Sequence, residues 1–429
     1  MGAIVFLQQK NKTNNTKLNN KMKTIAIAGT FDTKGREFLY LKGLIEQLGL
    51  NTYTINTGVF TPAFTPDVGS DQVAAAAGYD IKQIVERHDR ALAMEALSKG
   101  MLALVPKLYK EGHFDGIISM GGSGGSSLVA PAMRALPLGV PKVLVSTMAS
   151  GNVSQYVGTS DIIMMPSIVD VAGLNEVSKT IFRNAVLAVA GMVGLKDKLA
   201  PDTEQTKPLI AATMFGVTTP CVDEAKRYLE ERGYEVLVFH CTGTGGRTME
   251  SLINAGYFVG VLDLTTTEWC DELVGGVLNA GPDRLDAAIK CKVPQVVSVG
   301  ATDMVNFGPR DTVPAKFAQR NLYQHNPTVT LMRTTPDENV AMGRIMAGKW
   351  NKAEAPMVLM LPDGGVSMID ADGQPFEDKV ARKALFDTLK QGIDNPNVEI
   401  DELDCNINDK RFAQTAAQKL LDLIEAAKK

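Results

Sequence analysis

A stretch rich in glycine and serine, GGSGGSS at residues 121–127, is the strongest chemical signal in the sequence. It follows an apolar, strand-like run, FDGIISM, and precedes a helix-like run, LVAPAMRAL. Glycines let a ligand approach the backbone closely, and the unpaired amides at the start of a helix attract phosphate. The stretch therefore predicts a phosphate-binding turn. It is neither a P-loop, because no Gly-Lys-Ser/Thr ends it, nor a Gly-x-Gly-x-x-Gly turn.

The same residues also fit Gly-x-Ser-x-Gly, the nucleophile elbow of serine hydrolases, with Ser123 at the centre. That motif needs an acid and a histidine later in the chain. Only His240 and His325 follow, both in what we expect to be a second domain, and no His-Gly-Gly-Gly segment precedes the serine. A serine hydrolase is therefore the weaker hypothesis for this stretch.

Other polar segments follow strand-like runs in the first half of the chain: GTFDTKG (29–35), STMASG (146–151) and GTSDI (158–162). In open parallel sheets, ligands bind beyond the carboxyl ends of the strands. Asp32 and Lys34 could hold a Mg²⁺ ion and a phosphate, or they could be a cap and a solvated lysine. Asp161 could bind ribose hydroxyls or a metal, or cap a turn. No histidine–carboxylate cluster has the spacing of a metal site, so we expect no zinc.

The second half carries matching polar segments: MFGVTT (214–219), CTGTGGRT (241–248), DLTTTE (263–268) and GATD (300–303). Arg247 could clamp an anion, because guanidinium binds oxyanions through two hydrogen bonds. Glu268 and Asp303 could form a carboxylate pair, whereas His240 is more simply explained as a structural residue. The candidate residues for binding a small acid are Thr218, Thr219, Gly245, Gly246, Arg247, Thr265, Thr266, Thr267, Glu268 and Asp303.

The elements that must position these residues occur in a pattern that appears twice. From Lys23 and again from Pro208, an apolar run ends in a turn rich in Gly and Thr, and a helical run and a second strand follow. Each copy is a βαβ unit. We predict an α/β protein with two Rossmann-like, doubly wound parallel-sheet domains in tandem around a cleft, at residues 22–200 and 208–429.

Several further elements are predicted. A long helix at about 175–195 closes the first domain, and Asp409 caps a final helix. Residues 81–109 read as helical throughout after a loop-rich segment. Residues 1–21 read as a disordered extension, since their apolar and charged parts stand in the wrong order for a signal peptide.

The composition limits the class of protein. With 45% hydrophobic and 21% charged residues, the chain of 429 residues is typical of a soluble globular protein. A net charge of −4 gives no basic field for nucleic acid. The five scattered cysteines are typical of reduced thiols in a cytoplasmic protein, and no apolar run is long enough to span a membrane.

Nine motifs in order carry a resemblance: GTFDTK, GGSGGSS, VSTMASG, GTSDI, MFGVTTPCV, HCTGTGGRTMESL, DLTTTE, VGATDMVNFGP and LMRTT. From about Lys23 to the C-terminus, the chain resembles the family of the ATP-binding N-terminal domain of the tomato mosaic virus resistance protein, with its uncharacterised bacterial, fungal and plant relatives. The resemblance implies two Rossmann-like subdomains, ATP binding and self-association, which we expect to give a homodimer. The ATP-binding residues that it implies are Gly29, Thr30, Asp32, Thr33, Lys34, Gly121, Gly122, Ser123, Gly124, Gly125, Ser126, Ser146, Thr147, Ser150, Gly151, Thr159 and Asp161.

The leading hypothesis is a cytoplasmic ATP-binding protein with Mg²⁺ beside the phosphates. It could be an ATP-dependent enzyme acting on a small acid held in the second domain. The alternative is a non-catalytic nucleotide sensor or protein-interaction module. Whether the chain is an enzyme stays open at this point.

Overall fold

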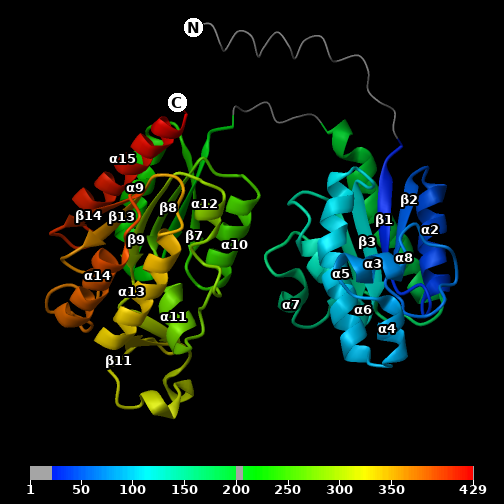
Figure 1. Cartoon of the computed structure of the whole chain (residues 1–429), viewed down its shortest axis with the longest axis horizontal. Helices are drawn as coiled ribbons and strands as arrows, with labels where there is room; N and C mark the ends of the chain where they lie inside the picture. The colour runs from blue at the N-terminus through cyan, green and yellow to red at the C-terminus, as the bar shows by residue number, and fades with distance from the viewer. Residues whose placement is uncertain (1–21, 200–205, 429) are drawn as a thin grey trace, which may run out of the picture. The chain divides into compact units, whose positions relative to one another are not determined.

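The computed structural model describes residues 22–199 and 206–428 (Figure 1). The expected extension at residues 1–21 lies outside the described residues. The chain divides into two compact units, with the boundary after Asp202. Each unit is built on a parallel sheet with helices on both faces, so the predicted fold class is confirmed.

In the first unit, five strands pair in the order β2-β1-β3-β4-β5, and every pairing is parallel. Their bounds are Thr24–Gly29 (β1), Asn51–Asn56 (β2), Gly116–Gly121 (β3), Lys142–Ser146 (β4) and Ile163–Pro166 (β5). The helices are Gly35–Gln47 (α2), Ser70–Ala76 (α3), Ile81–Glu86 (α4), Arg90–Lys110 (α5), Ser123–Arg134 (α6), Ser154–Val157 (α7) and Glu176–Leu195 (α8).

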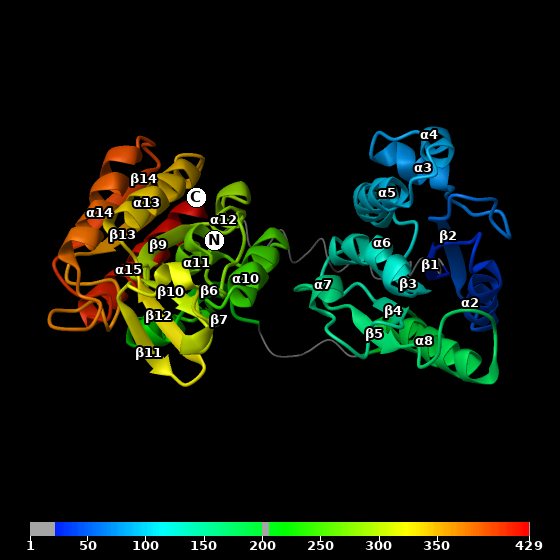
Figure 2. The ribbon, with the colours of Figure 1, turned by 90° about the horizontal axis from the view of Figure 1, so that it is seen from below.

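Alternate residues of β1 pack into two different cores. Ile25 and Ile27 lie in one buried cluster with residues of α2 and α8, whereas Ala26 and Ala28 lie in another with residues of α3, α5 and α6. Figure 2 shows α5 and α6 on one side of β1, β3 and β4, with α8 on the other. Burial on both faces explains why these strands are apolar throughout.

The second unit repeats this order and adds a strand: β14-β13-β9-β8-β6-β7, again parallel in every pair. The strands are Leu209–Met214 (β6), Glu235–His240 (β7), Gly260–Thr265 (β8), Gln295–Gly300 (β9), Met357–Pro362 (β13) and Val398–Leu403 (β14). The helices are Thr219–Glu230 (α9), Thr244–Asn254 (α10), Glu268–Val274 (α11), Ala287–Lys290 (α12), Pro336–Trp350 (α13), Lys379–Gly392 (α14) and Lys410–Ala427 (α15). Short 3₁₀ turns lie at Lys196–Lys198, Gly216–Thr218, Arg310–Thr312 and Ala315–Phe317.

The strand order fixes where ligands are expected. In both units the first strand lies between the second and the third, so the connections leave in opposite directions on either side of it. This topological switch point lies between β1 and β3 in the first unit and between β6 and β8 in the second. In open α/β sheets the ligand crevice lies there, outside the carboxyl ends of the strands.

The predicted helix at 175–195 is confirmed as α8, and the Asn175 side chain caps it by accepting a hydrogen bond from the Ser178 amide. Asp409 caps α15 as predicted. The continuous helix expected over 81–109 is wrong, because the backbone breaks between α4 and α5. His88 has a φ of 49°, and the Asp89 carboxylate accepts hydrogen bonds from the amides of Ala91 and Leu92, which starts a new helix.

A three-stranded antiparallel sheet in the second unit was not predicted. It contains Met304–Phe307 (β10), Leu322–Asn326 (β11) and Val329–Arg333 (β12), in the order β10-β12-β11. Within the described ranges, every helix is too short or too polar to cross a membrane.

Candidate functional site

A cavity of about 650 Å³ opens at the switch point of the first unit. It is lined by the turns that follow β1, β2 and β3, by the α4–α5 segment and by one residue that follows β5. The lining residues are Thr30, Asp32, Thr33, Lys34, Thr57, Gly58, Val59, Phe60, Ile84, Val85, His88, Asp89, Arg90, Ala93, Met94, Leu97, Gly122, Ser123, Gly124, Gly125, Leu128 and Asp170. The structure thus brings together the predicted residues from GTFDTKG and GGSGGSS.

The glycine turn after β3 is tight because backbone occupies the space that side chains would need. Gly121 ends the strand, Gly122 is the N-cap of α6, and Ser123 is the first helical residue. A Cβ on Gly121 would lie only 3.1 Å from the Cα of Gly125. The first amides of α6 have no carbonyl partner within the helix, and the helix dipole makes that end positive. The turn can therefore accept an anion.

The turn after β1 is held in place by the Asp32 carboxylate. One of its oxygens accepts a hydrogen bond from the Thr33 amide at 2.7 Å, and the other accepts one from the Phe60 amide at 3.0 Å. Gly58 is required beside it, since a Cβ there would lie 2.4 Å from the Asp32 carboxyl carbon. The Lys34 ammonium donates to the Val171 carbonyl oxygen. Asp32 therefore lines the cavity while its hydrogen bonds to the Thr33 and Phe60 amides hold the turn in place.

Thr57 lines the same cavity and is 2% exposed. Its hydroxyl has no hydrogen-bond partner among the described residues. Leaving such a buried polar group unpaired costs about 1–3 kcal/mol. A ligand that offers this hydroxyl a partner would offset that cost.

One part of the lining was missed by sequence reasoning. Residues 84–97 contribute an apolar wall, mostly from α5, together with His88 and Arg90 at the start of that helix. Phe60 adds an aromatic ring that is 65% exposed. The sequence signal that could have revealed this part is Asp89, a helix-capping residue type directly before an apolar-periodic run.

Several predicted residues lie beneath or beside the turn rather than in the cavity lining. The hydroxyls of Ser126 and Ser146 are 2.7 Å apart and buried, and the Thr147 amide donates to the Gly121 carbonyl oxygen. Gly29 is needed for packing, because a Cβ there would lie 2.0 Å from the Phe38 ring. Three further predicted residues outside the lining are Ser150, Gly151 and Thr159.

Asp161 corrects an expectation, because its carboxylate is the partner of a buried cation. It lies 2.5 Å from the Lys142 ammonium and accepts a hydrogen bond from the Gly139 amide at 2.7 Å. Burial acts to raise the pKa of Asp161, but the hydrogen bonds from Lys142 and Gly139 outweigh it and lower that pKa. The residue lies outside the cavity lining, so a role in holding ribose or metal there has no geometric support.

Ser123 has an exposed side chain at the start of α6. The two histidines that follow it lie in the second unit: His240 stacks on Phe215, with ring centroids 5.3 Å apart, and His325 lies on β11. Within the described residues, Ser123 has no hydrogen bond to a histidine. The geometry therefore does not assemble a hydrolase triad from the residues that follow the serine.

At the switch point of the second unit, the predicted threonines hydrogen-bond within the protein. The hydroxyls of Thr218 and Thr265 are 2.8 Å apart, and both residues are fully buried. Thr266 donates to the Ser298 carbonyl oxygen at 3.1 Å. Thr267 and Thr219 likewise donate to backbone carbonyl oxygens. These hydroxyls stabilise the strand ends.

Glu268 belongs to a buried ion network centred on Arg284. The guanidinium donates to Glu268 at 2.8 Å and to Asp263 at 2.6 Å, and both side chains are buried. The other oxygen of Glu268 accepts hydrogen bonds from the amides of Gly243 and Gly246. Gly246 is required because a Cβ there would lie 2.1 Å from Glu268, and one on Gly245 would lie 1.9 Å from the His240 carbonyl oxygen.

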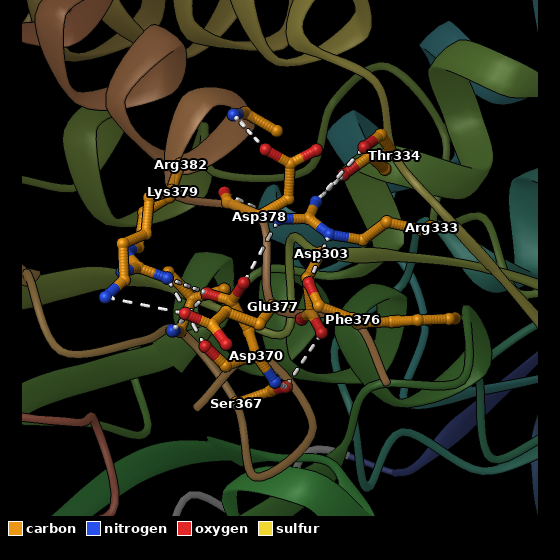
Figure 3. A network of polar contacts seen from close by, with 12 residues as sticks. Asp303, Arg333, Thr334, Ser367, Asp370, Phe376, Glu377, Asp378, Lys379 and Arg382 are labelled. Carbon is orange, nitrogen blue, oxygen red and sulfur yellow. Dashed lines mark hydrogen bonds and ion pairs between the residues drawn. The ribbon is translucent and has the colours of Figure 1, made fainter. Parts of the chain in front are cut away.

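Asp303 belongs to a different network (Figure 3). One of its oxygens accepts a hydrogen bond from the Ser367 hydroxyl at 2.8 Å, and the other has no partner among the described residues. Burial and the neighbouring Asp370 carboxylate raise the pKa of Asp303. Asp370 is itself paired with Arg333 and Arg382. Glu268 and Asp303 therefore do not form the expected carboxylate pair, because each has its own partners.

Arg247 is exposed on α10. Its guanidinium donates to the Asn279 carbonyl oxygen at 2.9 Å and to the Thr244 hydroxyl at 3.4 Å. The proposed anion clamp is thus already engaged in fastening two segments of the second unit.

The comparisons with known proteins agree with the two-unit architecture. Models of the N-terminal and C-terminal domains of an uncharacterised protein family, UPF0261, match residues 23–198 and 207–424. A UPF0261 protein from Clostridium tetani is 53% identical over 404 residues, which are 94% of this chain and 99% of that protein.

The tomato (Solanum lycopersicum) ToMV resistance protein Tm-1(GCR237) is 40% identical over 415 residues. The match covers 92% of this chain and 55% of the tomato protein, so the chain spans about half of that relative's length. A putative UDP-N-acetylglucosamine 2-epimerase from Listeria monocytogenes is 11% identical over 95% of this chain and 97% of its own, with a TM-score of 0.24 that carries no argument. The family resemblance expected from the nine motifs is confirmed, and the chain belongs to the uncharacterised protein family UPF0261.

Proposed function

We propose that the first unit binds ATP in the cavity at its switch point. The observation that carries the proposal is the glycine turn at the start of α6, which borders a cavity that is also lined by Thr57, whose buried hydroxyl is unpaired among the described residues. The phosphates would lie on the first amides of α6, and the adenine would lie against the apolar wall. A volume of about 650 Å³ is in the range of small-molecule sites.

Polar and apolar lining residues favour a nucleotide over a bare anion. Val59, Ile84, Met94 and Leu97 can cover the faces of an adenine ring, and the exposed Phe60 ring can stack on it. A simple phosphate would leave this wall in contact with water.

The residues that follow β1 fit a Mg²⁺ ion beside the phosphates. Each oxygen of Asp32 accepts one amide hydrogen bond, so lone pairs remain for a cation. The hydroxyls of Thr30 and Thr33, which are 3.0 Å apart, are further oxygen donors. The ion would neutralise phosphate charge, and Asp32 and these hydroxyls would hold it.

The proposal is limited to nucleotide binding. The internal hydrogen bonds of Thr218, Thr265 and Glu268 give no support to a small acid in the second unit. A homodimer and a cytoplasmic location stay predictions. Nucleotide binding without an assigned reaction is the function that the geometry supports best.

The test places a carboxylate where the phosphates would lie. Ser123→Asp adds a negative charge at the first position of α6, where the helix dipole stabilises it, so the fold should be retained. Repulsion between the new carboxylate and the ATP phosphates, at a separation of about 4 Å, should weaken ATP binding by roughly 100-fold. Isothermal titration calorimetry with ATP and Mg²⁺ measures the change.

Ser127→Asp is the matched control. Ser127 is exposed on the same helix and lies outside the cavity lining, so its variant should bind ATP within about twofold of the unmodified protein. Absence of ATP binding by the unmodified protein, or an equal loss in both variants, would overturn the proposal.

A further inference from the structure

Resting on the proposed function, we infer that Arg90 binds a phosphate of the nucleotide and is the main cation of this site. By sequence alone, Lys34 in GTFDTKG is the candidate residue for holding a phosphate. The geometry around the glycine turn instead favours a residue from the start of α5.

Arg90 lies beside the first turn of α6. Its Nη2 atom is 3.6 Å from the position that a Cβ on Gly124 would occupy, so the guanidinium is in contact distance of that glycine. A side chain at position 124 would compete with Arg90 and with the Met94 methyl group for the same space. The glycine therefore leaves room for the arginine as well as for a ligand.

The guanidinium has no carboxylate partner in residues 22–199 and 206–428. Asp89, the adjacent residue, uses its carboxylate to accept hydrogen bonds from the amides of Ala91 and Leu92. Lys34, by contrast, is oriented by its bond to the Val171 carbonyl oxygen on the loop after β5. Arg90 is thus available to an anion, whereas one of the three N–H groups of Lys34 is already used by a carbonyl oxygen.

The electrostatics of the site favour an anion at this position. Arg90 is the first residue of α5, whose first amides are already bonded to the Asp89 carboxylate, and it lies beside the positive end of α6, which has no side-chain cap. A cation at a helix N-terminus is unfavourable because the dipole repels it. The uncapped end of α6 and one guanidinium that border a single cavity make an arrangement that a phosphate group would stabilise.

The unpaired Thr57 hydroxyl is an independent sign that a ligand occupies this cavity. Thr57 follows β2, on a different segment from both helices, and it lines the same space and has a buried hydroxyl with no partner among the described residues. Guanidinium binds phosphate through two parallel hydrogen bonds, and a lysine cannot reproduce that geometry. Arg90 should therefore recognise the phosphate part of the ligand and leave the nucleoside part unaffected.

The experiment compares Arg90→Gln with Arg87→Gln. Arg87 is an exposed residue at the end of α4, three positions away, and lies outside the cavity lining. Affinities for ATP and adenosine are measured by calorimetry, with ligand-observed NMR for the weaker ligand. Arg90→Gln should weaken ATP binding by at least tenfold, leave adenosine affinity within twofold and reduce the salt dependence of ATP binding. Arg87→Gln should change none of these, and Arg90→Lys should restore ATP affinity only in part.

The outcomes separate this inference from the proposed function. Normal ATP affinity in Arg90→Gln, together with the loss in Ser123→Asp, would overturn the role of Arg90 and leave ATP binding in place. Equal weakening of ATP and adenosine would show that Arg90 only supports the fold of the α4–α5 segment. No ATP binding by the unmodified protein would overturn both.

Discussion

The two units have the same strand order around their switch points, but different groups lie there: a cavity in the first unit and a network of bonded side chains in the second. Between β1 and β3, the chain offers glycines, helix amides and an unpaired threonine hydroxyl around a cavity. Between β6 and β8, the corresponding position holds the Thr218–Thr265 hydrogen bond and the Arg284 ion network, all buried. One switch point is open to a ligand, and the other is filled by the protein's own side chains.

This difference teaches that topology alone does not make a binding site. The crevice at a switch point is available in both units, but in the second unit Arg284 from the segment after α11 enters the space and neutralises the carboxylates. An internal guanidinium there satisfies polar groups that a ligand would otherwise satisfy. Three sets of substitutions test the comparison, from the largest expected effect to the smallest.

Arg284→Met should have the largest effect. It leaves the carboxylates of Asp263 and Glu268 buried without their cation, which typically costs about 3–5 kcal/mol. Both tryptophans of the chain, Trp269 and Trp350, lie in the second unit, so urea unfolding followed by tryptophan fluorescence reports that unit. ATP affinity in the first unit should not change.

Arg247→Met is the matched control for this variant. Its side chain is exposed and its hydrogen bonds to Asn279 and Thr244 lie at the surface, so the free energy of unfolding should change by only about 1 kcal/mol. If Arg284→Met were as stable as the control, the second switch point would not be the ion-filled core that the structure indicates.

Asp271→Asn tests whether the buried carboxylates of the second unit control its stability. Burial raises the pKa of Asp271 to about 7, against hydrogen bonds from the amide and side chain of Asn306 that act to lower it. The unfolded carboxyl loses its proton near pH 4, so the contribution of Asp271 to the free energy of unfolding is greatest at low pH and falls as pH rises towards 7. Between pH 5 and pH 7, this group should account for a loss of about 2–3 kcal/mol.

The asparagine variant has no ionisable group there and should show a smaller loss over the same pH range. Urea unfolding at pH 5, 6, 7 and 8, with the same fluorescence signal, measures the slope. An unchanged slope in the variant would mean that Asp271 ionises in the folded protein as an ordinary carboxyl does.

A matched pair of threonine substitutions should have the smallest effects on stability and separates the two switch points directly. Thr218→Val removes the hydroxyl that bonds to Thr265, which should lower the free energy of unfolding by about 1–2 kcal/mol without changing ATP affinity. Thr57→Val removes a buried hydroxyl that has no partner among the described residues, so the free energy of unfolding should rise by about 1 kcal/mol while ATP affinity falls severalfold. Calorimetry and thermal unfolding measure both variants, and equal behaviour of the two would contradict the distinction.

Much of the fold could be predicted from sequence because the strands are buried on both faces. Apolar runs such as KTIAIAG and PLIAATMFG stand out, and the turns after them carry the glycines that end each strand. The antiparallel sheet was not predicted because β10 and β12 have only four and five residues and β11 is largely exposed and gives no apolar run. The break at His88 escaped because apolar residues continue on both sides of it.

The site was predictable only in part, for a physical reason. A turn such as GGSGGSS shows its backbone chemistry directly, whereas a threonine or glutamate shows nothing of its partner. The structural role of Glu268 depends on Arg284 and on two amides of α10, contacts that no local spacing reveals. In the same way, Arg90 becomes a candidate ligand only when α5 is packed against α6.

The long connection between β1 and β3, which supplies the cavity wall, also affects how the first unit folds. In the first unit, Ile25 pairs with Gly116 across β2 and the helices α3 to α5, whereas in the second unit Ile210 pairs with Gly260 across a much shorter segment. Closing the longer loop costs roughly 0.5 kcal/mol more in chain entropy before the central strands can join. Folding rates fall as such non-local contacts dominate, so the first unit should assemble its central strand pair more slowly than the second.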